Sequence, residues 1–128
     1  MKKVRCLLVF WIGVLIIGCG PDTIFLRNGL DTPVQHVANG HQLLKRGKVD
    51  DACREFKRAQ ELDPQYVKAY VGLGVALGQK GDHDAGMASM NQARQLADDP
   101  QEISEVKKGY EQLDALKHEK APPLPDGR

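Results

Sequence analysis

The chain has 128 residues with 18 basic and 17 acidic side chains, which give a formal net charge of +1 at pH 7. Both signs are interspersed, so the sequence offers no basic stripe for a nucleic-acid backbone. It also lacks the glycine-rich phosphate loops, H-E-x-x-H and G-x-S-x-G patterns that mark common catalytic sites. We therefore expect a small noncatalytic protein without a cofactor.

A basic head and an apolar run open the chain. Met1–Arg5 carries three basic side chains, and residues 6–18 are almost entirely apolar. The run is short for a membrane-spanning helix, so residues 1–18 are predicted to be a secretory signal peptide. A non-lipidated signal and a transmembrane anchor are the alternatives. Removal of residues 1–18 leaves 15 basic against 17 acidic residues, a net charge near −2.

The end of this run, from Ile16 to Cys19, resembles a bacterial lipobox. The resemblance implies that Cys19 is acylated, becomes the first mature residue and anchors the protein stably through several chains. Gly20 stands where an aspartate would retain an enteric lipoprotein at the inner membrane, so the resemblance implies the outer membrane, facing the periplasm. Residues 19–32 would be the lipidated N-terminus and tether. Its apolar segment Ile24–Leu26 either lies among lipid headgroups or packs on the domain.

The region from His36 to Ala93 contains two similar segments at a spacing of 34 residues, which is typical of stacked supersecondary units. The recurring pairs are Gly40 and Gly74, Leu43 and Leu77, Gly47 and Gly81, Asp50 and Asp84, Ala59 and Ala93, and Leu62 and Leu96. Apolar residues recur every three or four positions, as on amphipathic helices. Gly47 and Gly81 fall where the backbone must turn sharply. Each segment is therefore predicted to be a helix hairpin.

These residues resemble the tetratricopeptide repeat (TPR), whose pattern is W-x2-L-G-x2-Y, then A-x3-F, then P. The matching residues are Tyr70, Leu73, Gly74 and Leu77 in a first helix, and Ala52, Phe56, Ala59 and Pro64 in a second helix. The resemblance predicts an all-α, TPR-like helix-hairpin solenoid of about two repeats over residues 33–117. An unrelated helical bundle is the alternative. His36 and Asn39 occupy positions that are apolar in the family, which predicts a weakly packed first helix.

Capping signals indicate where these helices begin. Thr32 is predicted to cap the first helix, with Pro33 in its first turn. Asp63 and Pro64 are predicted to begin the second repeat in the same way. Asp82-His83-Asp84 looks like a metal triplet, but adjacent side chains on a helix point apart, so we interpret it as a capping segment.

A further helix follows the second hairpin. Asp99-Pro100 with Glu102 resembles a capping box with aspartate in the cap. The apolar positions that follow are Ile103, Val106, Tyr110, Leu113 and Leu116. This spacing predicts one apolar face, which would cap the open end of the array. Residues 118–128 are proline-rich and are predicted to form a disordered tail.

Two features bear on stability. Gly72, Gly78 and Gly86 lie inside predicted helices, where each costs roughly 0.8–1 kcal/mol relative to alanine. Because arrays generally need about three repeats, we expect modest thermal stability or self-association that covers the open first repeat. Cys53 remains after the signal is removed and Cys19 is acylated, so no internal disulfide is expected. Its predicted role is that of a small hydrophobic residue, with a reactive thiol as the alternative.

In TPR arrays the first helix of each repeat lines a concave groove, and the resemblance implies a peptide-binding groove here. The residues expected to face it are Val37, His41, Lys45, Lys68, Val71, Val75, Gly78, Glu102 and Glu105. Val37 and Val71 stand where some members carry a lysine that clamps a terminal carboxylate, so no such clamp is expected. The strip is mildly apolar and fits an extended or helical apolar segment. Alternatively, its valines pack against the next helix.

These patterns together indicate a membrane-anchored scaffolding module for protein–protein interaction in an envelope assembly. A pilotin-like accessory of a pilus or secretion system is the specific hypothesis. The alternative is a noncatalytic subunit of an envelope complex that acts in cell-wall processing or proteolysis. The expected partners are a protein or peptide segment, the membrane through the lipid, and a second copy of the chain.

Overall fold

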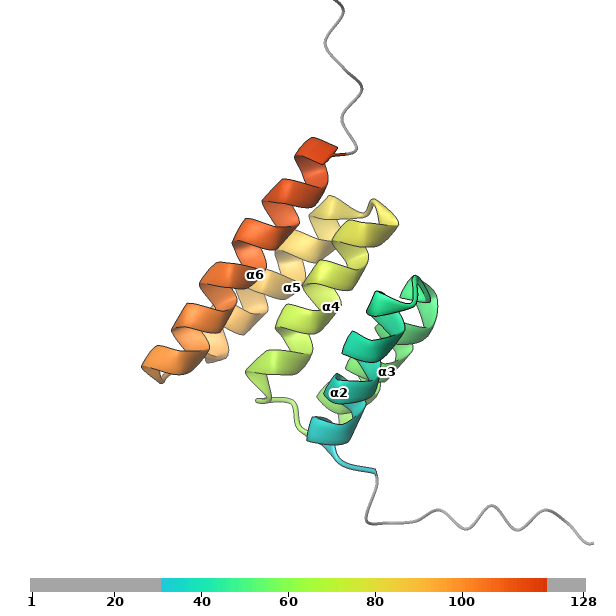
Figure 1. Cartoon of the computed structure of the whole chain (residues 1–128). Helices are drawn as coiled ribbons and strands as arrows, with labels where there is room; N and C mark the ends of the chain where they lie inside the picture. The colour runs from blue at the N-terminus through green and yellow to red at the C-terminus, as the bar shows by residue number, and fades with distance from the viewer. Residues whose placement is uncertain (1–30, 120–128) are drawn as a thin grey trace, which may run out of the picture.

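A computed structural model describes residues 31–119. Its helices are α2 (Pro33–Lys45), α3 (Val49–Leu62), α4 (Val67–Lys80), α5 (His83–Leu96) and α6 (Pro100–Glu119). The hairpin of α2 and α3 stacks beside the hairpin of α4 and α5, and α6 packs along the second hairpin (Figure 1). The fold is the predicted all-α, TPR-like helix-hairpin solenoid with a C-terminal helix.

The predicted signal peptide, Cys19, the tether as far as residue 30 and the tail from residue 120 lie outside the described residues. Within residues 31–119, no helix is both long and apolar enough to cross a membrane. His118 and Glu119, predicted to belong to the tail, are the last residues of α6. Basic side chains in a last turn interact favourably with the helix dipole, and Lys117 and His118 occupy that turn.

The predicted turns and most of the predicted caps are confirmed. Gly47 and Gly81 have φ angles of 72° and 100°, the left-handed region that glycine adopts without a steric penalty. Thr32 accepts a hydrogen bond from the backbone N–H of Gln35, at 3.2 Å. Asp82 accepts one from the backbone N–H of Ala85, at 3.1 Å. The Asp82 carboxylate therefore caps α5, as predicted.

The α6 cap is also confirmed, with one difference. Asp99 Oδ1 accepts from the backbone N–H groups of Gln101 and Glu102 at 2.7 and 2.9 Å. The Glu102 carboxylate reaches back, as in a capping box, but it accepts from the N–H of Asp98 at 3.4 Å. Glu102 therefore acts at the start of α6 and does not face a groove, which corrects its predicted role.

The predicted start of the second repeat is wrong by three residues. Asp63 and Pro64 form a turn, in which the N–H of Gln65 donates to Asp63 Oδ1 at 3.0 Å. The Pro64 carbonyl accepts from the Tyr70 hydroxyl at 2.8 Å. α4 therefore begins only at Val67, with Tyr66 as its N-cap.

The core of the first hairpin is built around Phe56, which is fully buried. Its ring lies against glycines of two other helices. A Cβ added at Gly40 in α2 would lie 2.7 Å from the ring, and one added at Gly72 in α4 would lie 2.2 Å from it. These glycines make room for Phe56, so their low helix propensity is offset by packing.

Leu113 of α6 packs against glycines of the second hairpin in the same way. A Cβ added at Gly78 would lie 2.4 Å from Leu113 Cδ1, and one added at Gly86 would lie 3.0 Å from the same atom. Gly86 also lies close to Gly74, whose carbonyl oxygen would be 2.9 Å from the added Cβ. Gly78 is thus buried beneath α6, and the prediction that it faces the groove is wrong.

Polar contacts occupy the positions near the start of α2 where the TPR pattern has apolar residues and where weak packing was predicted. His36 Nδ1 lies 2.8 Å from Glu55 Oε2, and His36 Nε2 lies 2.8 Å from Asp31 Oδ1. Asn39 also donates to Glu55 Oε2 at 3.2 Å, while Arg58 donates to Asp31 Oδ2 at 2.8 Å. Burial lowers the pKa of His36, but its hydrogen bonds to the two carboxylates outweigh burial and raise the pKa above 6.5. These contacts hold α2 to α3.

The burial of Cys53 and Ile103 tests the sides of α3 and α6 on which these residues were predicted to lie. Cys53 is buried in the first core, as predicted for a small hydrophobic residue, and burial raises the pKa of its thiol. Ile103, which was predicted to lie on the packed face of α6, is 56% exposed. It lies at the outer edge of the array beside Arg94 of α5 and Ala97, the C-cap residue of that helix.

Candidate functional site

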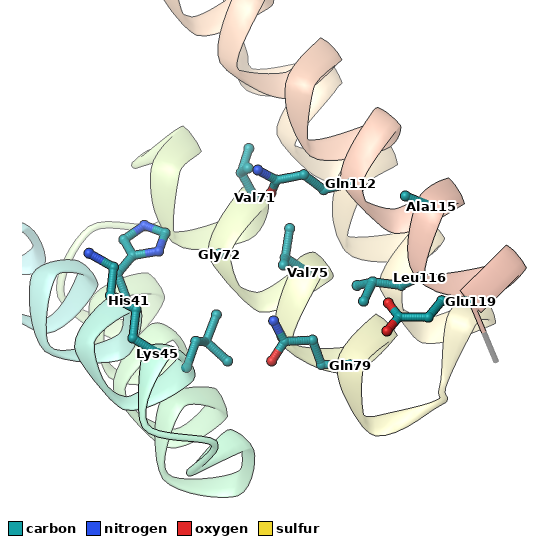
Figure 2. A pocket seen from close by; sticks show the side chains of 11 residues that line it. His41, Lys45, Val71, Gly72, Val75, Gln79, Gln112, Ala115, Leu116 and Glu119 are labelled. Carbon is teal, nitrogen blue, oxygen red and sulfur yellow. The ribbon is translucent and has the colours of Figure 1, made fainter.

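A groove runs over the surface of α4, between α2 on one side and α6 on the other. It encloses a hollow of about 710 Å³. Its lining residues are His41, Leu44, Lys45, Val71, Gly72, Val75, Gln79, Gln112, Ala115, Leu116 and Glu119. Figure 2 shows the α4 residues in the middle, with His41 and Lys45 on one wall and the α6 residues on the other. Three helices far apart in the sequence therefore build one concave surface.

The chemistry of the groove is apolar with polar edges. Val75 of α4 is half-buried on its floor, and Leu116 is half-buried on the α6 wall. Leu44 adds an apolar side chain from α2. Lys45 and Glu119 are exposed on the two opposing walls. Such a surface can bury apolar side chains of a peptide while its edges contact the polar backbone.

The local environment of His41 suits this apolar setting. Its ring contacts Phe56 edge-on, with ring centroids 5.2 Å apart and planes at 72°. Burial lowers the pKa of His41 below 6.5; the nearby Lys45 adds to this effect, and Glu105 opposes it. The lowered pKa favours the uncharged form of the ring, so Lys45 is the fixed cation of the α2 wall.

Four of the predicted groove residues lie in this lining: His41, Lys45, Val71 and Val75. Val71, however, is only 8% exposed and also belongs to the core between α4, α5 and α6. A Cβ added at Gly109 of α6 would lie 2.9 Å from Val71 Cγ1. The alternative, that this valine packs against the next helix, is therefore correct for most of its side chain.

The other predicted residues lie elsewhere. Val37 is 6% exposed and is buried in the core of the first hairpin, so its assignment to the groove is wrong. Lys68 and Glu105 form an ion pair at 3.7 Å between α4 and α6. Both precede the groove-lining segments of their own helices, so this pair joins the helices beyond the groove.

The residues of the α6 wall and three lining positions on the earlier helices were not predicted from the sequence. The missed lining residues are Leu44, Gly72, Gln79, Gln112, Ala115, Leu116 and Glu119. A signal for Gln79 was present, since Val71, Val75 and Gln79 follow one another at intervals of four residues on α4. On α6, Gln112, Ala115 and Glu119 also share one helix face, but the residues predicted to face the groove from this helix were Glu102 and Glu105, nearer its start.

The described residues contain no group of three or more His, Cys, Asp or Glu side chains placed to hold a metal ion. The fold and the groove define the protein as a helix-hairpin module for protein–protein interaction. Residues 40–81 match the family described as TPR repeat. A 49-residue stretch is 43% identical to the RNA polymerase-associated protein CTR9 of Caenorhabditis elegans, covering 38% of this chain. The match spans about 4% of that much longer protein.

Proposed function

We propose that this chain is a lipid-anchored, noncatalytic scaffolding subunit of a bacterial envelope assembly, which captures an apolar protein segment in the groove over α4. The observation that carries the proposal is the groove itself, an apolar-floored hollow of about 710 Å³ with polar walls. Extended or helical peptides bind such surfaces by burying alternate or periodic side chains.

The proposed location follows from the sequence from Ile16 to Cys19, which resembles a lipobox. Acylation of Cys19 would hold the domain at a membrane surface, and Gly20 favours the outer membrane with the domain facing the periplasm. A tethered adaptor binds its partners at a high effective concentration. We propose a pilus or secretion accessory of the pilotin kind as the assembly.

Site-specific photo-crosslinking in intact cells tests the groove. A photoreactive residue at Gln112, on the α6 wall, is compared with one at Lys57, which is exposed on α3 away from the groove lining. We expect Gln112 to crosslink to one defined protein and Lys57 not to do so. Ala115→Glu, which places a charge on the same wall, should remove that crosslink. Equal crosslinking from both positions would refute the groove assignment.

The identity of the crosslinked protein separates the candidate assemblies. A pilus or secretion component supports the proposed role, whereas a cell-wall hydrolase or protease would replace it with a subunit of an enzyme complex. Mass spectrometry of the mature chain tests the anchor independently. We expect acyl chains on Cys19 and their loss in Cys19→Ser, and an unacylated mature Cys19 would refute the lipid anchor.

A further inference from the structure

The outer surface of α5 and α6, on both sides of Tyr110, ends the array on the side away from the first hairpin (Figure 1). We call this surface the end face. It exposes two large apolar side chains, Met87 of α5 at 43% and Ile103 of α6 at 56%. Neither side chain lines the groove over α4. The end face is therefore a second candidate interaction surface.

Two hollows of opposite charge lie on the end face, and Tyr110 lines both. The first, of about 380 Å³, surrounds Ile103 and carries the cations Arg94 and Lys107 against the single anion Glu111. The second, of about 300 Å³, surrounds Met87. Its charged side chains are the anions Asp84 and Asp114 and the cation Lys117, with His83 beside them. Each hollow thus combines one exposed apolar side chain with an excess of one sign.

This arrangement is complementary to itself. A two-fold rotation about an axis through Tyr110 turns a second copy end for end, so that the basic hollow of each copy faces the acidic hollow of the other. Lys107 and Asp114 lie on opposite sides of Tyr110 and are seven residues apart, about two helical turns. In an antiparallel pair of α6 helices, each Lys107 would therefore meet the partner's Asp114. Isologous contacts of this kind are the commonest basis of symmetric dimers.

We propose that the end face binds a second copy of this chain through an antiparallel pairing of α6 helices. Ile103 and Met87 supply the apolar contacts, and Lys107 with the partner's Asp114 fixes the register on both sides of the axis. Within one chain Asp114 lies 3.6 Å from His118 Nε2, but both side chains are more than 70% exposed. An exposed pair of this kind competes only weakly with an interface contact.

The proposed dimer keeps both grooves free. Gln112, Ala115 and Glu119 point into the groove, whereas Lys107, Tyr110 and Asp114 belong to the end face of the same helix. The dimer would therefore present two grooves to a partner that carries repeated segments, which raises avidity without a new contact. This inference concerns a separate surface and holds whether or not the groove partner is the proposed one.

The test uses the full chain, co-produced with two different affinity tags and solubilised in mild detergent. One tag is captured and the amount of the other is measured. We expect clear co-capture, reduced about fivefold or more by Lys107→Glu or Asp114→Lys, since each change places like charges together. In the double variant each copy carries both reversals, so the opposite pairing is restored and co-capture should return.

Lys108→Glu is the matched control, because it makes the same change of charge at an exposed α6 position outside both hollows. It should leave co-capture unchanged. Two results would overturn the proposal: absence of co-capture for the unchanged chain, or a double variant that remains as weak as the single ones. Rescue cannot arise within one chain, since seven residues of helix separate the two positions by about 10 Å.

Discussion

Replacing Gly72 by alanine separates helix propensity from packing. Propensity alone predicts that alanine in the middle of α4 stabilises the domain by about 0.8–1 kcal/mol. The structure predicts the opposite sign, because the new Cβ would lie 2.2 Å from Phe56 Cε1 and 2.5 Å from Phe56 Cδ1. The ring cannot move away freely, since Gly40 of α2 approaches it as well and the side chain is fully buried.

The magnitude follows from these contacts. Inserting a methyl group into a packed core costs about 1–3 kcal/mol, and so close an approach to a confined ring favours the upper end. After the gain in propensity is subtracted, we expect a net loss of about 2 kcal/mol in the free energy of unfolding. For a domain of this size that loss lowers the melting temperature by about 8–16 °C.

Thermal unfolding followed by circular dichroism measures this change. Phe56→Leu supplies the control, because leucine lacks the ring atoms Cε1 and Cζ, which would lie 2.2 and 2.7 Å from the new Cβ. We expect Gly72→Ala to cost less in the Phe56→Leu background than in the unchanged protein, which a double-mutant cycle reports as a coupling energy. A melting temperature that stays equal or rises in Gly72→Ala would refute the packing argument.

The remaining predictions concern the groove, a cap and pH. Val71→Glu should lower the free energy of unfolding by at least about 2 kcal/mol, because this side chain is 8% exposed and a buried charge is unfavourable. Ala115→Glu, at an exposed groove position, should change the free energy of unfolding by under about 0.5 kcal/mol and should abolish partner crosslinking. Equal melting temperatures for Val71→Glu and Ala115→Glu would contradict the assignment of Val71 to the core. Asp82→Ala should cost about 1 kcal/mol in urea unfolding through loss of the α5 cap, and Asp82→Asn, which keeps an acceptor, should cost less. The pKa of His36 is raised in the folded protein, so the stabilisation of the fold by protonated His36 is fully present below about pH 6.5 and is lost as pH rises through the folded pKa. The free energy of unfolding, measured over a series of pH values, should show this decline. The same decline in His36→Gln would assign the effect to another group.

The hairpins were predictable because their signals are local. Gly47 and Gly81 mark turns by their backbone conformation alone, and the caps at Thr32 and Asp99 need only neighbouring N–H groups. The start of α4 was mispredicted because the same residue types also form turns. In the structure the carbonyl of Pro64 accepts from the hydroxyl of Tyr70 within α4, a contact that the local sequence pattern does not indicate.

The groove was only partly predictable because its residues are sorted by contacts between helices. Val71 and Val75 share a face of α4 by spacing, but α6 covers the first more fully than the second. The glycines illustrate the same limit. From the sequence alone, Gly78 only lowers the propensity of α4 to be helical. Its packing role depends on Leu113, which lies 35 residues further along the chain.

The seating of Leu113 against Gly78 and Gly86 links binding to local unfolding. α6 supplies one whole wall of the groove, so molecules in which α6 has detached cannot bind a partner, even when the first hairpin is intact. Terminal elements open with a smaller free energy than the centre of an array. A groove ligand binds only the closed form and must therefore slow hydrogen exchange of the α6 amides in proportion to its concentration over Kd. The occupancy of the groove and the protection of the last helix are thus two measurements of one equilibrium.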